Sequence, residues 1–102
     1  MEVNQYLEMF IDESKEHLQS CSEHLLDLEK NPNDLAIVSE IFRSAHTLKG
    51  MAATMGFEDL ADLTHKMENV LDAIRNAEII VTSVILDVVF ESLDHLEEMV
   101  ND

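Results

Sequence analysis

Apolar residues recur at intervals of three and four residues in four stretches of the chain. This spacing places them on one face of an α-helix, where they can pack against neighbouring helices. The pattern predicts helices over about 3–30, 34–55, 58–77 and 83–101. In the first stretch the apolar series is interrupted by one polar position, Ser14. In the third stretch the predicted core positions are Leu60, Leu63, Met67, Val70, Ile74 and Ala77.

The breaks between these stretches carry residues that end helices. Pro32 cannot continue the first helix, and Asn33 or Asp34 can cap the second. Gly56 stands where a helix commonly ends in a left-handed residue. Because the connections are short, the chain is predicted to be all-α, an antiparallel up-and-down four-helix bundle with left-handed crossing.

Composition narrows the class of protein. A chain of 102 residues with 46% hydrophobic residues fits a single domain over 1–102. A net charge of −16 disfavours binding to nucleic acid or to anionic membranes. No apolar run approaches the roughly 18 residues of a membrane span, and no basic segment marks a signal peptide. The single cysteine, Cys21, excludes an internal disulfide, so we expect a cytoplasmic protein.

His46 is the residue that departs from the core pattern of the second helix. At 100° per residue it lies about 130° from the centre of the apolar stripe, so its ring should be largely exposed. Arg43 and Lys49 flank it three residues away on the same face, and Gly50 follows one turn later. A glycine there offers bare surface to another protein, although a simple helix irregularity is an alternative. A lone exposed histidine is often idle, and that alternative stays open.

The third predicted helix brings a second group of polar residues to the same place. It runs antiparallel to the second helix after the turn at Gly56, so residues equally distant from that turn share a height. Counting from the turn pairs His46 with Glu68 and Lys49 with His65. We therefore expect these four side chains to meet on one face of the two helices.

This group has the composition of a site for a covalent step on histidine. A nucleophilic histidine needs a neutral ring, and a carboxylate hydrogen-bonded to one N–H fixes the tautomer and supports the developing positive charge. Glu68 is placed for that role, Lys49 can neutralise a phosphoryl group, and His65 can join the network. We interpret His46 as a phosphate carrier. Ordinary pairing of the basic residues with nearby acids on the helices is the alternative.

Other kinds of site have little support. A di-iron bundle needs two Glu-x-x-His pairs and two further inward glutamates, and this chain has no Glu-x-x-His, so no metal is expected. No glycine-rich phosphate loop is present, so ATP binding is not expected. Cys21 lies on the apolar stripe and is interpreted as a core residue. His17, His24 and His95 stand among acidic residues and are interpreted as solvated.

Two segments carry a family resemblance, AHTLKGMAATMGF at 45–57 and THKMENVLD at 64–72. They resemble the histidine phosphotransfer (HPt) domain, and more narrowly the N-terminal phosphotransfer domain of chemotaxis histidine kinases. Three further segments fit the same family: Tyr6-Leu7-x-x-Phe10-x-x-Glu13, 25–29 and 41–43. Gly50 and Gly56 match its two glycines, whereas Ala53 stands where glycine is common. The resemblance covers nearly the whole chain, although the family often adds a fifth helix and a linker.

The resemblance implies a function. His46 would be phosphorylated on Nε2 by the kinase's ATP-binding domain, usually that of the partner subunit. The phosphoryl group would then pass to an aspartate of a response regulator of the chemotaxis type (CheY or CheB). Glu68 would orient His46 through Nδ1, and Lys49 and His65 would complete the network. Arg43 and Gly50 are the candidate docking positions, and Gly56 is structural.

The resemblance also implies that cofactor binding and kinase activity belong to other parts of the protein. ATP and Mg²⁺ would bind the separate kinase domain, so we expect no cofactor here and no activity of the isolated domain. We expect the chain to be the N-terminal part of a longer protein-histidine kinase. Two alternatives remain, a stand-alone relay protein with the same chemistry and a helical adaptor that is never phosphorylated.

Overall fold

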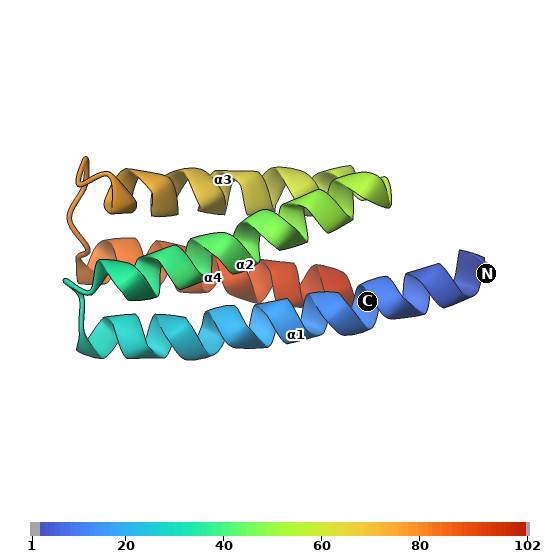
Figure 1. The fold of residues 1–102 in the computed structure, drawn as a ribbon, viewed down its shortest axis with the longest axis horizontal. Helices are drawn as coiled ribbons and strands as arrows, with labels where there is room; N and C mark the ends of the chain where they lie inside the picture. Colours follow the sequence, from blue (N-terminus) through green and yellow to red (C-terminus); the bar gives the residue numbers. More distant parts are fainter. Residues whose placement is uncertain (1–2, 102) are drawn as a thin grey trace.

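Four α-helices run up and down along one long axis in the computed structural model, which describes residues 3–101 (Figure 1). The helices are α1 (Val3–Lys30), α2 (Leu35–Thr54), α3 (Glu58–Arg75) and α4 (Ser83–Asn101). The predicted all-α, four-helix architecture is confirmed, and the predicted bounds differ from the observed ones by at most two residues.

Each helix packs against two neighbours around a common core. α2 lies between α1 and α3, and α4 closes the bundle against α1 and α3. The bundle measures 45 × 20 × 20 Å. Its largest fully buried apolar side chains are Leu25, Leu28, Val38, Ile41, Leu48, Leu71, Leu93 and Leu96, together with Cys21. Outside α3, the apolar faces predicted from the spacing are therefore the faces that meet in the core.

Helix ends follow the local chemistry of the sequence. The Asp34 carboxylate accepts a hydrogen bond from the Ala36 amide at 3.1 Å and caps α2, as predicted. Gly56 adopts a left-handed φ of +79° after α2. The amides of Gly56 and Phe57 then donate to the carbonyls of Ala53 and Ala52 at 3.1 and 2.9 Å. This turn sets the relative height of α2 and α3.

The buried face of α3 is rotated from the predicted stripe. Leu63 and Val70, predicted as core positions, are half-buried, whereas Thr64 and Leu71 are completely buried. The Thr64 hydroxyl donates to the Leu60 carbonyl at 2.6 Å, which satisfies the polar group inside the core. A threonine can therefore occupy a core position that an apolar pattern passes over.

The end of α3 corrects a second prediction. Ala77, expected as the last core residue of this helix, is exposed, lies beyond Arg75 and has a φ of 60°. The amides of Ala77 and Glu78 donate to the carbonyls of Ile74 and Ala73 at 3.0 and 2.8 Å. This is the hydrogen-bond pattern of a left-handed helix end, normally formed with glycine.

Two small polar side chains of α1 are enclosed by the core. Burial raises the pKa of the Cys21 thiol to about 11, partly opposed by a hydrogen bond with Ser44. The thiol is therefore protonated and unreactive at neutral pH, as its interpretation as a core residue requires. Ser14, the polar step in the apolar stripe, is completely buried.

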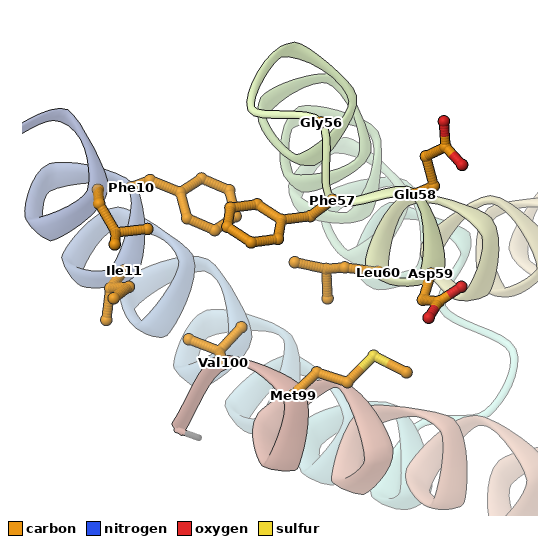
Figure 2. A pocket seen from close by; sticks show the side chains of 10 residues that line it. Phe10, Ile11, Gly56, Phe57, Glu58, Asp59, Leu60, Met99 and Val100 are labelled. Carbon is orange, nitrogen blue, oxygen red and sulfur yellow. The ribbon is translucent and has the colours of Figure 1, made fainter. Parts of the chain in front are cut away.

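One end of the bundle is open. The first turns of α1 project past the other helices there (Figure 1). A pocket of about 580 Å³, with mixed apolar and acidic lining, lies between this projection, the turn from α2 to α3 and the last turn of α4. Phe10 and Phe57 stack across it with ring centroids 5.2 Å apart, and Met99 and Val100 form the α4 side (Figure 2). The stacked rings tie the projecting part of α1 to the α2–α3 turn.

Candidate functional site

His46 lies on α2 with its ring turned away from the core. Its neighbours Ala45 and Leu48 are fully buried, and its own side chain is 63% exposed. The predicted exposure is confirmed. A partner protein can therefore reach the imidazole without any opening of the bundle.

Glu68 of α3 holds one nitrogen of that ring. Nδ1 of His46 lies 2.9 Å from Oε2 of Glu68. A carboxylate can only accept, so Nδ1 carries the hydrogen and donates it. The second nitrogen, Nε2, is then unprotonated in the neutral ring and has a lone pair. The expected meeting of these two residues across the helix pair is confirmed.

Lys49 completes the contacts of the carboxylate. Its Nζ donates to Oε1 of Glu68 at 2.9 Å, so the two carboxylate oxygens are used by two different donors. The Glu68 side chain is only 10% exposed, and this burial raises its pKa. The hydrogen bonds from Lys49 and His46, together with the positive charge of Lys49, outweigh burial, and the pKa of Glu68 falls below its ordinary value. Glu68 is therefore ionised at neutral pH.

His65 is not joined to this group. It lies one turn before Glu68 on α3 and is exposed. Within residues 3–101 its ring makes no hydrogen bond to His46, Lys49 or Glu68. Its side chain is exposed to solvent instead of meeting the other three. Its participation in the network stays a prediction.

The candidate docking positions lie along α2. Arg43 is exposed and its Nη1 donates to Glu40 at 3.1 Å, so its guanidinium is directed along its own helix. Gly50 is exposed, and a Cβ atom built there would meet no atom within 4 Å. It lines a shallow groove of about 520 Å³ that also includes His46, with Tyr6 and Glu13 of α1 on the opposite side. The space expected above Gly50 is present.

Phe42 lies beside His46 and Arg75 lies over Phe42, and neither was predicted as a site residue. The Phe42 ring is nearly parallel to the imidazole, at 10°, with centroids 6.0 Å apart. The Arg75 guanidinium covers the Phe42 ring, with Cζ 3.9 Å from its centroid. The spacing from Phe42 to His46 is one helical turn, which could have indicated the contact. The contact of Arg75 with Phe42 joins two helices, so it could be predicted only from the position of α3 relative to α2.

Comparison with known families shows the family to which the chain belongs. Residues 5–102, and so nearly the whole chain, match the family model of the Hpt domain. The chain belongs to the Hpt domain family. The resemblance inferred from the segments at 45–57 and 64–72 is thereby confirmed.

Relatives place this Hpt domain among those of chemotaxis proteins. Chemotaxis protein CheA of Bacillus subtilis (strain 168) is 69% identical over 98% of the chain, which spans 15% of the length of that relative. The CheA phosphotransferase domain from Thermotoga maritima is 50% identical, with a TM-score of 0.95 over 99% of this chain and 96% of that one. The phosphorylated P1 domain of CheA3, solved in complex with CheY6 from R. sphaeroides, shares the fold at 22% identity, with a TM-score of 0.90 over 97% and 77% of the two chains.

Among residues 3–101, no three His, Cys, Asp or Glu side chains gather in a way that could hold a metal ion. No helix in the same range is both long and apolar enough to cross a bilayer.

Proposed function

We propose that this Hpt domain is the phosphoacceptor and phosphotransfer domain of a chemotaxis sensor kinase, with His46 as the carrier. One observation carries the proposal: Glu68 binds Nδ1 of His46 and leaves Nε2 free on an exposed ring. A histidine nucleophile needs this arrangement, because the bound N–H fixes the tautomer and the free lone pair attacks. Relatives identified as CheA support the same assignment.

The first step is attack by Nε2 on the γ-phosphorus of ATP bound to a separate kinase domain. A P–N bond forms, the bond between phosphorus and the ADP oxygen breaks, and ADP leaves. The ring keeps its hydrogen on Nδ1 and becomes positively charged. Glu68, ionised and 2.9 Å away, stabilises that charge in the transition state more than in the neutral ground state.

The second step returns the ring to its starting state. An aspartate carboxylate oxygen of a response regulator attacks the phosphorus, and the P–N bond breaks. The electron pair of that bond returns to Nε2, which restores the neutral imidazole with its hydrogen still on Nδ1. The domain thus carries the phosphoryl group between two proteins without a net change of its own.

Lys49 and His65 have supporting roles in this proposal. Lys49 keeps Glu68 ionised and oriented through its 2.9 Å contact, and its charge opposes that of a phosphoryl group on the nearby ring. His65 is exposed one turn from Glu68 and is free to rotate towards a phosphoryl group. Arg43 and Gly50 belong to the surface on which the kinase domain and the response regulator dock.

The remaining features of the proposal concern the parent protein. The chain spans 15% of the length of its B. subtilis relative, so we infer that the protein-histidine kinase activity, ATP and Mg²⁺ belong to other domains. Response regulators of the CheY and CheB type are the proposed acceptors, and the cytoplasm is the proposed location. The isolated domain is then a substrate and donor of phosphoryl groups, inactive with ATP alone.

The test is labelling by a chemotaxis kinase core that lacks its own phosphotransfer domain. With ATP labelled in the γ-phosphate, we expect acid-labile, base-stable label on the wild type and none on His46→Gln. His95→Gln is the matched control, because that ring is also exposed, at 61%, and also lies beside a glutamate. Label retained on His46→Gln, or a wild type unlabelled beside a positive control domain, would contradict the proposal.

A further inference from the structure

Phe42 bounds the His46 ring from the preceding turn of α2. The two rings are nearly parallel, at 10°, with centroids 6.0 Å apart. Phe42 is half-buried and packs against the core, so its position is set by the bundle. The imidazole therefore lies beside a fixed flat surface, although its own side chain is largely exposed.

Arg75 holds Phe42 from the other helix. Its Cζ lies 3.9 Å from the centroid of the Phe42 ring, the geometry of a cation–π contact. The Nη2 atom of Arg75 also donates to Oδ1 of Asp72 at 2.9 Å. The guanidinium is thus held at one nitrogen by Asp72, while its central carbon lies over the phenyl ring. The last turn of α3 reaches His46 through this chain of contacts.

One hydrogen bond does not orient an imidazole fully. The contact between Nδ1 of His46 and Glu68 fixes the tautomer, but the ring can still swing about that bond. The direction of the Nε2 lone pair changes with the swing, and an in-line attack on phosphorus depends on that direction. A second contact on the ring plane removes this freedom. The parallel ring of Phe42 supplies such a contact.

We propose that Phe42, held by Arg75, is a positioning residue that fixes the plane of the His46 ring for phosphoryl transfer. The proposal rests on the proposed function, because it gives the stacked arrangement a role in the reaction at Nε2. Glu68 then selects the nitrogen that reacts, and Phe42 sets the direction in which it faces. The two roles are separable by substitution.

The first test replaces Phe42 with two residues of comparable size. Phe42→Leu keeps an apolar side chain without a flat ring, and we expect phosphorylation at His46 to slow by about tenfold. Phe42→Tyr keeps the ring, and we expect it to retain a rate near that of the wild type. Phe90→Leu is the matched control, because Phe90 is a half-buried phenylalanine of α4. A wild-type rate in Phe42→Leu would overturn the proposal.

Arg75→Met tests the same contact without touching the core. Its side chain is 38% exposed, so the variant should fold even if Phe42→Leu does not. We expect a smaller decrease in rate, about threefold, because the phenyl ring stays but is less firmly held. Lys30→Met, at the exposed end of α1, controls for the loss of one positive charge. An Arg75→Met variant with unchanged rate would show that Arg75 has no positioning role.

A spectroscopic measurement separates this proposal from a structural effect and from failure of the proposed function. In the wild type, the Phe42 ring current should shift the carbon-bound ring protons of His46. We expect that shift to disappear in Phe42→Leu and persist in Phe42→Tyr, while the Nδ1-protonated tautomer stays in all three. Absence of the shift in the wild type would overturn the stacked arrangement. If the wild type is never phosphorylated, the proposed function fails, but the ring-current shift still tests whether Phe42 lies parallel to the His46 ring.

Discussion

Nδ1 of His46 on α2 and Oε2 of Glu68 on α3 lie 2.9 Å apart, although the two residues are 22 positions apart in the chain. The turn at Gly56 produces this contact, because it sets the two helices antiparallel with both residues at one height. The contact joins a largely exposed ring to a largely buried carboxylate. The reactive ring is thereby accessible to a partner protein, and the carboxylate that supports its charge is shielded from solvent between the helices.

Removing the charge of Glu68 should slow the reaction without unfolding the protein. Glu68→Gln keeps the shape of the side chain but loses the negative charge that stabilises a positive imidazole. We expect phosphorylation at His46 to slow on the order of 10- to 100-fold, as for other groups that orient a functional histidine. Glu58→Gln, an exposed position in the first turn of α3, is the matched control. Wild-type labelling rates in Glu68→Gln would remove Glu68 from the mechanism.

The same carboxylate should make stability depend on pH. The pKa of Glu68 is lowered in the folded protein, so its ionised form stabilises the fold above the ordinary glutamate pKa. That stabilisation is lost as the pH falls through the lowered pKa, because the folded state must then take up a proton. We expect the stability difference between wild type and Glu68→Gln, measured by denaturant unfolding, to be largest near neutral pH and to shrink in acid. A difference that is constant from pH 7 to pH 3 would refute the coupling.

Gly50 should matter for docking and not for stability. A Cβ atom there meets nothing within 4 Å, and glycine inside a helix costs roughly 0.5–1 kcal/mol relative to alanine. Gly50→Gln should therefore be at least as stable as the wild type and yet transfer its phosphoryl group more slowly to a response regulator. Ala53→Gln is the control on the same helix, at an exposed position outside the groove. Equal transfer rates in the two variants would show that the space above Gly50 is not needed.

Ala77 offers a route to a more stable domain. Its φ of 60° is strained for a residue with a Cβ atom and natural for glycine. We expect Ala77→Gly to raise the free energy of unfolding by roughly 0.5–1 kcal/mol. Ala53→Gly, inside α2, should instead lower it by about 1 kcal/mol. Chemical denaturation compares the two directly, and an Ala77→Gly variant less stable than the wild type would contradict the strain.

The main features of the fold were predictable because they depend on backbone geometry. Apolar spacing locates the helices, Asp34 and Gly56 mark their ends, and counting from the turn aligns His46 with Glu68. What could not be predicted depends on side-chain conformation. Counting from the turn also predicts that His65 joins the group, but its side chain is exposed to solvent. The contact of Arg75 with Phe42 depends on how far α3 is rotated about its own axis. The apolar pattern does not reveal that rotation, because the buried face of α3 includes the polar residue Thr64. Its hydroxyl can be buried because it donates a hydrogen bond within its own helix.

The most direct test of the account is to identify the ring nitrogen that carries the phosphoryl group. Protein labelled with ¹⁵N-histidine would be phosphorylated by the kinase core and studied by NMR, which separates Nδ1 from Nε2 by shift and by coupling to phosphorus. Because Glu68 holds Nδ1, the account predicts phosphorus on Nε2 of His46, with the hydrogen retained on Nδ1. Phosphorus on Nδ1, or on any other histidine, would contradict it.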